Sequence, residues 1–447
     1  MPEAYGIKGF HKENLPILPP VFTLIPRQIK EGKGYKADPA AVAQLKVIEK
    51  LFRECEGIIV ATDAGREGEL IFRFIYEYLG IAKPFDRLWI SSLTDKAIKE
   101  GLARLQSGVA YDNLYYAARA RSEADWLVGI NGTRLYSRLY GIKLNVGRVM
   151  TPTLAMVAQR EKEIAAFQVE RFYTVQLSCG FPAQSGRIKT REEAERIRAS
   201  CHCKKAAVKQ IERRQKKEKP PKLYDLTTLQ REANRLFGFT AKQALDYAQQ
   251  LYEKKLLTYP RTDSQYLTED MGQTAQHLVS DLLGLLPFAQ GLDLTPEVGR
   301  ILNSKKVSDH HAILPTSEFV KQGFTGLAES ECKLMNLVCA KLLCAVAVPH
   351  EYETVTAVFS CAGNEFAAKG KTVLVPGWKE IDQRFRSTLK ADTEEEVLNT
   401  LPELAEGQSF SVTANVSEHF TSPPKAYTDV IFCERKEWIG IEERSSA

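Results

Sequence analysis

The sequence predicts a multidomain α/β protein, and three observations support this. Its 447 residues exceed the length over which a single hydrophobic core grows, so about three domains are expected. Near the start, a helical pattern, a short β-branched run and a second helical pattern indicate an α/β unit. Two stretches of alternating apolar and polar residues, 172–178 and 353–359, flank a long helical region. They indicate a β-rich domain that the chain leaves and re-enters.

The first predicted domain, residues 1–110, contains the α/β unit. Residues 38–55 are predicted to form a helix, because Pro39 suits a first turn and apolar residues recur at helical spacing. Residues 57–62 have the apolar, β-branched composition of a buried strand in a parallel sheet. A helix is expected after the acidic loop of residues 63–69. Polar chemistry is therefore expected where the strand ends.

The remaining residues divide into four segments and a tail by the same patterns. Two helical patterns, a β-rich stretch with one charged helix, a longer helical region and a second β-rich stretch follow one another. In order they are a helical domain at 111–170, the first part of a β-rich domain at 171–222, a helical domain at 223–345, the returning β-rich part at 346–420 and a tail at 421–447.

Two features of the middle of the chain bear on partners. Asp225 and Thr240 are predicted to cap two short helices that resemble a helix-turn-helix, a common way to present a helix to DNA. Lysines and arginines crowd into residues 204–222, which either follow nucleic-acid phosphates or form a solvated linker. The net charge of +5 does not decide between these two interpretations.

The overall composition indicates an ordinary soluble protein. Hydrophobic residues make up 44% and charged residues 26% of the chain, and no apolar run approaches the ~20 residues of a membrane helix. Residues 1–5 lack the pattern of a signal peptide, so a cytoplasmic location without a membrane partner is expected. The nine cysteines suggest reduced thiols, because the Cys-His-Cys triplet at 201–203 lacks a second ligand pair at zinc spacing.

The most informative motif is residues 257–264, Leu-Thr-Tyr-Pro-Arg-Thr-Asp-Ser. Tyr259 is a possible nucleophile, because a neighbouring cation such as Arg261 stabilises a phenolate. Arginine also binds phosphate in a two-pronged manner. Tyrosine beside arginine therefore suits attack on a phosphodiester. The alternative is a Tyr-Pro turn in which a polar residue caps the next helix.

Other motifs place acids, histidines and arginines in suggestive contexts. Asp63 and Glu67 lie four residues apart, where they either share a cation such as Mg²⁺ or complement a helix N-terminus. His310 and His311 follow an aspartate and either move protons or form a structural turn. Arg148 precedes a Thr-Pro helix start that suits phosphate binding.

Taken together and in order, six motifs resemble the type IA DNA topoisomerases, most closely the bacterial topoisomerase III branch. The resemblance extends from about residue 5 to about residue 428. The motifs are Thr-Asp-Ala-Gly-Arg-Glu-Gly-Glu at 62–69, Arg-Ala-Arg-Ser-Glu-Ala-Asp-Trp at 119–126, Gly-Arg-Val-Met-Thr-Pro-Thr-Leu at 147–154, Pro-Pro-Lys-Leu-Tyr-Asp-Leu at 220–226, Thr-Tyr-Pro-Arg-Thr-Asp-Ser at 258–264 and Asp-His-His-Ala-Ile-Leu-Pro-Thr at 309–316.

The resemblance implies a toroidal arrangement of a Toprim α/β domain, a β-rich arch and helical domains. It implies an ATP-independent isomerase that cleaves one DNA strand, holds its 5′ end as a phosphotyrosine, passes a strand and religates. Single-stranded and negatively supercoiled DNA are the implied partners, and Mg²⁺ is the implied cofactor. The implied roles are nucleophile for Tyr259, phosphate binding for Arg261, catalysis for His310, DNA binding for Arg121 and Arg148, and metal binding for Asp63 and Glu67.

The chain departs from the family pattern in three places. Gly65 stands where the metal-binding motif Asp-x-Asp-x-Glu has its middle acid, so weaker metal binding is expected. The first Toprim strand and its glutamate are missing, and residues 430–440 match nothing in the family. A chain lacking both ends and having reduced activity is therefore expected. The alternative is a catalytically inactive fragment that binds single-stranded DNA.

Overall fold

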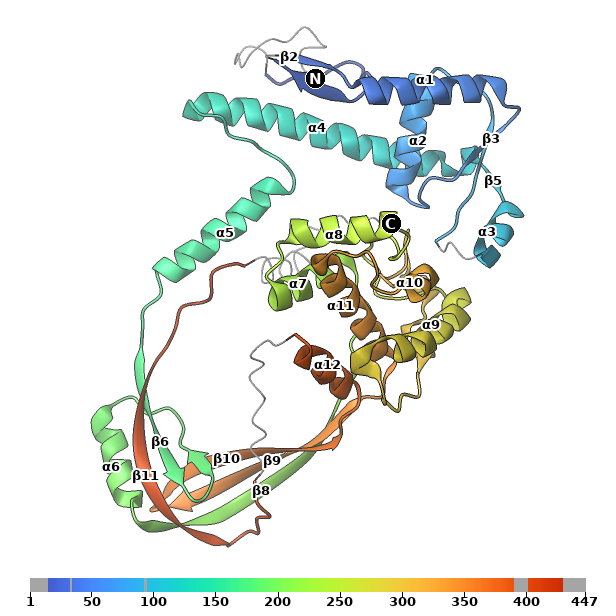
Figure 1. Cartoon of the computed structure of the whole chain (residues 1–447). Helices are drawn as coiled ribbons and strands as arrows, with labels where there is room; N and C mark the ends of the chain where they lie inside the picture. Colours follow the sequence, from blue (N-terminus) through green and yellow to red (C-terminus); the bar gives the residue numbers. More distant parts are fainter. Residues whose placement is uncertain (1–14, 33, 92–94, 390–400, 429–447) are drawn as a thin grey trace.

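The computed structural model describes residues 15–32, 34–91, 95–389 and 401–428. Its elements follow one another around a ring, as Figure 1 shows. An N-terminal α/β unit leads through two linking helices to a β-barrel, and long strands return from the barrel to a helical unit that lies opposite the α/β unit. This arrangement agrees with the multidomain, toroidal fold that the sequence predicts.

The N-terminal α/β unit, residues 15–111, has a small mixed sheet between helices. Strand β3 (Ile58–Val60) pairs in parallel with β4 (Phe85–Arg87), which pairs antiparallel with β5 (Gln106–Ser107). Helices α1 (Pro39–Glu54), α2 (Arg66–Tyr78) and α3 (Asp95–Leu102) accompany it, and the hairpin of β1 (Gln28–Glu31) and β2 (Gly34–Ala37) precedes α1. The predicted order of helix, strand, acidic loop and helix is confirmed. Sequence periodicity alone did not indicate the antiparallel strand.

Local sequence explains why α1 begins where it does. The side chain of Asp38 accepts a hydrogen bond from the backbone N–H of Ala40, and Pro39 occupies the first turn. Proline suits this position because its fixed φ is helical and its missing N–H has no partner there. The helix therefore lies within one residue of each predicted end, with Asp38 as its cap.

Two linking helices connect the α/β unit to the barrel. Helix α4 (Asp112–Tyr140) packs its first half against α2, where Tyr115 and Ala118 of α4 are buried with Leu70 of α2. Helix α5 (Met150–Ala165) leads to the barrel. Both helices lie where the sequence predicts them.

The β-rich domain is a closed barrel in the order β10-β7-β6-β11-β8-β9. Its first strands are β6 (Arg171–Ser178), β7 (Pro182–Gln184) and β8 (Lys204–Glu218), with α6 (Arg191–Cys201) packed on β6 and β11. The chain re-enters through β9 (His350–Cys361), β10 (Asn364–Val375) and β11 (Ser409–Phe420). The ring of strands closes through a single paired position between β10 and β7, Ala367 with Gln184.

The basic stretch at 204–222 is largely strand β8, so its interpretation as a linker is wrong. Along the strand, basic side chains pair with acids of neighbouring strands. Arg213 lies 3.1 Å from Glu353, and Lys217 lies 2.7 Å from Glu351. A strand is possible here because β9 supplies ladder partners along β8 from Ala207 to Glu218.

The helical unit has the largest core in the described part of the chain. It contains α7 (Leu226–Phe237), α8 (Ala241–Glu253), α9 (Gly272–Leu285), α10 (Ser317–Gln322) and α11 (Glu329–Val346). Asp225 and Thr240 cap α7 and α8 through hydrogen bonds to the third residue of each helix, as predicted. Most of α11 is buried, which makes it the central helix of this core.

One helix lies in a different unit from the one that the sequence predicts. Helix α12 (Trp378–Ser387) follows β10 within the segment assigned to the returning β-rich domain. Its Ile381 and Phe385 are buried in the core of the helical unit, where Phe385 contacts Phe288. The amphipathic spacing of these two residues suits a helix, but its packing partner is distant in sequence.

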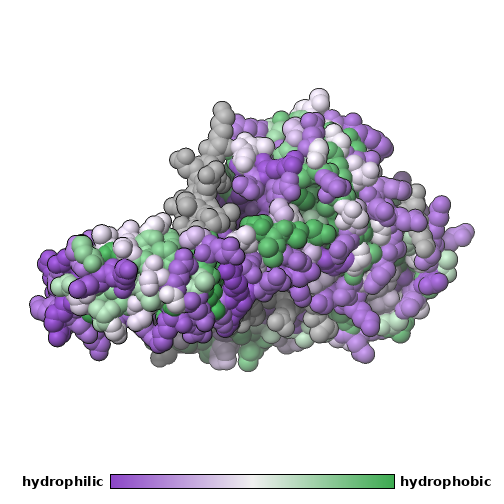
Figure 2. Space-filling model, turned by 90° about the horizontal axis from the view of Figure 1, so that it is seen from below, coloured by the Kyte–Doolittle hydropathy of each residue, from purple (hydrophilic) through white to green (hydrophobic). Residues whose placement is uncertain are grey.

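The surface agrees with the composition. Seen from below, hydrophilic side chains cover most of the visible face, with smaller hydrophobic areas between them (Figure 2). Within the described residues, no helix combines the length and apolar character needed to cross a membrane.

Candidate active site at the boundary of two units

The loop that carries Tyr259 is tied to a second loop of the helical unit. The backbone N–H of Thr258 donates to the carbonyl of Leu314 at 2.9 Å, and the N–H of Leu314 donates to the Thr258 hydroxyl at 2.8 Å. The hydroxyl of Thr262 donates to the carbonyl of His310 at 2.9 Å. These bonds place the tyrosine motif and the histidine motif side by side.

His310 lies between Tyr259 and the acidic loop of the α/β unit. The rings of Tyr259 and His310 have centroids 4.3 Å apart, and Tyr252 packs edge-on against Tyr259 at 5.3 Å. His310 Nε2 lies 3.5 Å from Asp63 Oδ2. Three motifs that are distant in sequence therefore meet at one place, on the boundary of two units.

The electrostatic environment of Tyr259 differs from the sequence expectation. Burial raises the pKa of the Tyr259 phenol, the carboxylate of Asp63 acts in the same direction, and Arg261 acts in the opposite direction. As predicted, Arg261 lowers the pKa of the phenol. Burial and Asp63 outweigh it, so the pKa is raised overall, and the predicted net stabilisation of the phenolate is wrong. The phenol therefore keeps its proton until a group removes it.

Arg261 is exposed beside the tyrosine. Among the described residues it forms no hydrogen bond or ion pair, so its guanidinium is accessible to an anion from solution. Arginine is the side chain best suited to bidentate phosphate binding. The position is compatible with the phosphate-binding role that the resemblance implies.

His311, the second histidine of the motif, faces away from this arrangement. Its Nδ1 lies 2.7 Å from the carbonyl oxygen of Ala312, and burial lowers the pKa of its imidazole. It therefore has the environment of a structural residue, whereas the catalytic role of His310 stays a prediction.

Asp63 is positioned by a buried arginine. Arg87 is fully buried, and its guanidinium donates to the carbonyl oxygens of Val60 at 3.1 Å, Thr62 at 2.7 Å and Asp63. Its Nε also donates to the buried carboxylate of Glu69 at 3.0 Å. Arg87 thus fixes the backbone at the end of β3. Arg87 was not among the predicted site residues, although a fully buried arginine is unusual.

Gly68 allows the acidic loop to fold tightly on itself. An ideal Cβ at Gly68 would lie 2.1 Å from the carbonyl oxygen of Asp63, which is closer than carbon and oxygen can approach. The Thr62 hydroxyl donates to the carbonyl of Gly68 at 2.8 Å across the same turn. In this structure Gly68 therefore makes room for the protein backbone.

Asp309 is a third carboxyl group close to Asp63. Burial raises its pKa to about 6. The carboxylates of Asp263 and Asp63 act in the same direction. His310 and Arg66 oppose them. No role was predicted for Asp309, although it directly precedes the two histidines of the motif.

The donors available to a metal ion are few. Asp63 and Glu67 are each about half exposed, with side-chain exposures of 54%, and each faces one basic neighbour, His310 and Arg66 respectively. No group of three His, Cys, Asp or Glu side chains suited to a metal occurs in the described part of the chain. Two carboxylates fit Mg²⁺ chemistry, because Mg²⁺ keeps several waters and commonly takes one or two carboxylates plus substrate phosphates.

The two predicted DNA-binding arginines lie on the linking helices. Arg121 belongs to α4, and Arg148 precedes α5. Arg148 Nε lies 3.0 Å from Asp125 Oδ1 of α4, which fixes the short connection between the two helices. Their role in DNA binding stays a prediction.

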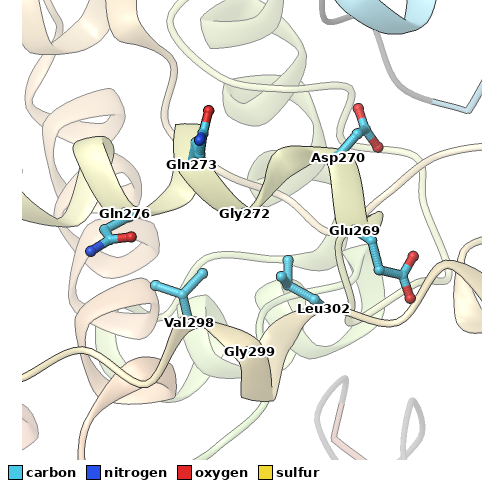
Figure 3. A pocket seen from close by; sticks show the side chains of 8 residues that line it. All are labelled: Glu269, Asp270, Gly272, Gln273, Gln276, Val298, Gly299 and Leu302. Atoms are coloured by element: carbon cyan, nitrogen blue, oxygen red, sulfur yellow. The ribbon is translucent and has the colours of Figure 1, made fainter.

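A pocket of about 510 Å³ lies elsewhere in the helical unit. It is formed between α9 with the preceding short helix η4 (Glu269–Met271) and the short helix η6 (Val298–Ile301). Val298 and Leu302 point toward α9, whereas Asp270 points away (Figure 3). None of the predicted site residues lines this pocket.

Comparisons with known proteins agree with this geometry. A family model described as DNA topoisomerase matches residues 109–434, which is most of the chain. A DNA topoisomerase 3 from Bacillus licheniformis is 38% identical over 445 residues, covering 96% of this chain and 59% of the relative. One from Bacillus thuringiensis (strain Al Hakam) is 41% identical over 428 residues, covering 92% and 57%. The chain thus spans somewhat over half the length of these relatives.

A solved structure supports the fold. Full-length topoisomerase I from Thermotoga maritima matches with a TM-score of 0.71 at 23% identity, covering 91% of this chain and 67% of that one. The motifs, the fold and the family match therefore agree, and the chain belongs to the type IA DNA topoisomerase family, in the branch whose relatives are named DNA topoisomerase 3.

Proposed function

We propose that the chain changes DNA topology by cleaving and religating one DNA strand through Tyr259, without ATP. One observation carries this proposal. Tyr259 packs on His310, and His310 contacts Asp63, so the nucleophile, a base and an acid from separate motifs converge. Neither a turn nor a helix cap accounts for all three side chains meeting at the boundary of two units.

The proposed reaction is a pair of transesterifications. The phenol oxygen of Tyr259 attacks the phosphorus of a DNA phosphodiester, the P–O3′ bond breaks, and the 5′ end stays joined to the protein as a phosphotyrosine. The leaving 3′ oxygen takes up a proton. Religation is the reverse step, and the tyrosyl ester stores the bond free energy, so the reaction balances without a nucleotide.

Each side chain has a proposed task that suits its environment. The raised pKa of Tyr259 means that its proton must leave during attack, and His310 is the adjacent base that we propose accepts it. Arg261, exposed and unpaired among the described residues, binds the scissile phosphate. Arg87 acts indirectly, by holding the backbone of Asp63.

The proposal also includes a metal ion, the DNA substrates and the cellular location. Asp63 and Glu67 of the Toprim domain hold Mg²⁺, which neutralises phosphate charge when bound. Single-stranded and negatively supercoiled DNA are the proposed substrates, with backbone contacts from Arg121 and Arg148. The strand-passage gate opens between the Toprim domain and the helical unit, and the chain acts in the cytoplasm.

Covalent trapping tests the proposal. The chain is mixed with 3′-labelled single-stranded DNA, with and without Mg²⁺, and denatured, and label migrating with protein is measured. An adduct is expected for the natural sequence, and none for Tyr259→Phe, which keeps the ring packing on His310 but lacks the phenol oxygen. Tyr252→Phe is the matched control and should keep the adduct.

Two results would contradict the proposal. An adduct that persists in Tyr259→Phe would assign the chemistry to another residue. DNA binding with no adduct under any condition would instead support a single-stranded DNA-binding protein without cleavage activity. Filter binding of the same labelled DNA separates this outcome from a failure to bind.

A further inference from the structure

Two lysines from distant segments converge on the ring of Tyr266. The Nζ atom of Lys222 lies 5.4 Å from the ring centroid, and the Nζ atom of Lys306 lies 4.9 Å from it. Lys222 belongs to the motif at 220–226, which has no part in the site described above, and Lys306 ends the short helix η7 (Ser304–Lys306). Both lysines are exposed. One aromatic ring therefore gathers two cations on the surface of the helical unit.

The two ammonium groups have no anionic partner in the described part of the chain. Neither lysine forms an ion pair there. The acids of the same loops bond elsewhere. Asp225 accepts a hydrogen bond from Gln265 at 2.8 Å, and Glu269 accepts one from the Ser304 N–H at 3.0 Å. Because both ammonium groups face one ring, they lie within about 10 Å of each other, a distance over which charges still interact at 0.1 M salt. An anion bound beside them would offset their repulsion.

This lysine pair is fixed to the loop that carries Tyr259. The backbone N–H of Ala312, which directly follows the two histidines, donates to the carbonyl of Tyr266 at 2.9 Å. The Ser264 hydroxyl lies 2.9 Å from the carbonyl oxygen of Lys306 and 3.2 Å from that of Tyr266. Ser264 is the last residue of the tyrosine motif. The lysine pair and the proposed nucleophile therefore belong to one connected set of loops.

The lysine pair also lies within a short reach of Arg261. Tyr266 follows Arg261 by five residues, which span at most about 18 Å of extended chain. One strand of DNA advances about 3.4 Å per nucleotide along a duplex, and a single strand can extend further. A strand whose phosphate lies at Arg261 therefore needs no more than about five nucleotides to arrive at the lysines.

We propose that Lys222 and Lys306 bind backbone phosphates of the single DNA strand that Tyr259 cleaves, a few nucleotides from the phosphate at Arg261. Lysine binds phosphate as a point charge, and contacts to the backbone position a strand without reading its sequence. Tyr266 acts indirectly, because its ring holds both ammonium groups in place. The inference rests on the proposed function, since it concerns the same DNA strand.

The salt dependence of oligothymidylate binding, measured by fluorescence anisotropy, tests the inference. All chains carry Tyr259→Phe, so that binding is measured without cleavage. Losing one phosphate contact to a single strand reduces the slope of log K against log salt by about 0.7. Lys222→Gln with Lys306→Gln should therefore reduce the slope by about 1.4. Lys222→Arg with Lys306→Arg keeps both charges and should keep the slope.

A second pair of lysines is the matched control. Lys321→Gln with Lys333→Gln removes the same charge from the helical unit, but these lysines pair with Glu318 and Glu329, each at 2.7 Å. This double variant should leave the slope unchanged. Thermal unfolding of each variant checks that the fold persists. Lysines with a purely structural role would change the unfolding midpoint without changing the slope.

Three outcomes overturn the inference. The first is an unchanged slope in Lys222→Gln with Lys306→Gln. The second is an equal reduction in the control pair, which would mean that only the total charge matters. The third is a reduction that occurs with duplex DNA but not with oligothymidylate. Because these slopes are measured without cleavage, they are distinguishable from a missing Tyr259 adduct, which bears on the proposed function alone.

Discussion

The helical unit and the α/β unit form the two walls of the site, and their cores differ. The helical unit, which carries Tyr259, has an extensive apolar core in which most of α11 is buried. The α/β unit, which carries Asp63, has two small apolar clusters and relies on a buried ionic pair, Arg87 with Glu69. A large core gives a rigid body, whereas a thin core with a charge network depends on a few bonds.

This difference suits the opening and closing that the proposed strand passage requires. The proposed nucleophile Tyr259 and His310 belong to the unit with the larger core, and Asp63 and Glu67 to the unit with the smaller one. The ionic pair gives the thin wall directional bonds, because Arg87 donates to successive carbonyls at the end of β3. Local stability should therefore be lower in the α/β unit than in the helical unit.

The largest loss of unfolding free energy is expected from Glu69→Gln in the α/β unit. It leaves the buried charge of Arg87 without its partner, and breaking a buried pair in this way typically costs about 3–5 kcal/mol of unfolding free energy. Hydrogen–deuterium exchange should accelerate in α2 and β3 but not in α11. The loss should be local because α11 belongs to a separate core.

Asp112→Asn is the matched control for Glu69→Gln. Asp112 also pairs with an arginine of this network, Arg73, at 2.7 Å, but its side chain is 34% exposed. Partly exposed pairs contribute little, about 0–1 kcal/mol. Equal destabilisation by the two variants would contradict the special role of the buried Arg87–Glu69 pair. Faster exchange in α11 after Glu69→Gln would contradict the independence of the two cores.

The next effect is expected in the opposite wall. Leu251 of α8 is fully buried, so Leu251→Ala should cost roughly 2–5 kcal/mol of unfolding free energy. Because the rest of this core remains, Tyr259 should still form its adduct at low temperature. Thermal unfolding and covalent trapping measure the two properties on one sample.

Val348→Ala is the matched control for Leu251→Ala. Val348 is 40% exposed and lies between α11 and β9, so its truncation should change the thermal midpoint little. A Leu251→Ala chain that loses its adduct while still folded would show that the helical wall is not the rigid body inferred above.

Short-range features were predictable from the sequence. The caps at Asp225 and Thr240 follow from side chains that bond to the helix they precede, which is a local effect. The strand before Asp63 follows from its composition. Motif order indicated that Tyr259 and His310 belong together, and the structure places their rings in contact.

Long-range features were not predictable. The role of Arg87 depends on carbonyl groups that only the folded loop brings together. The basic strand β8 resembled a linker because its acidic partners lie on β9, far along the chain. The glycine at position 65 suggested a missing acid, and nothing local showed that the side chain of Asp309, far along the chain, lies beside it.

A smaller effect is expected at the turn that carries Asp63. Gly68→Ala would place a methyl group 2.1 Å from the carbonyl oxygen of Asp63, and backbone cannot yield as a side-chain tip can. Overpacking of this kind costs about 1–3 kcal/mol. Adduct yield should fall as Asp63 shifts. Gly80→Ala is the control. No atom lies within 4 Å of an ideal Cβ at Gly80, but its φ is +61°, so this variant adds backbone strain without a clash near Asp63.

The Gly80→Ala control shows whether a loss of adduct comes from the clash at the Asp63 turn or from lower stability of the α/β unit. Gly80 ends α2, away from the acidic loop, so its alanine variant should be less stable yet keep its adduct. If both glycine variants lost the adduct in proportion to lost stability, the position of Asp63 would not be the cause.

The smallest effect concerns pH and the contact between the walls. Burial raises the pKa of Asp309 from its ordinary 3.8 to about 6. Between these two pH values the closed contact binds a proton that the separated state does not, so closure weakens as pH rises from about 4 through about 6 and then levels off. Asp63 acts oppositely and only below its ordinary value of 3.8, because His310 lowers the pKa of that carboxyl.

Hydrogen–deuterium exchange of residues 62–68 in a chelating buffer measures this change, after correction for the intrinsic pH dependence of exchange. Protection should fall between pH 4 and pH 6 in the natural chain and stay level in Asp309→Asn, which cannot ionise. His310 and Arg66 are common to both chains, so their charges cancel in the comparison. The same fall in both chains would mean that the two units separate for a reason other than the ionisation of Asp309.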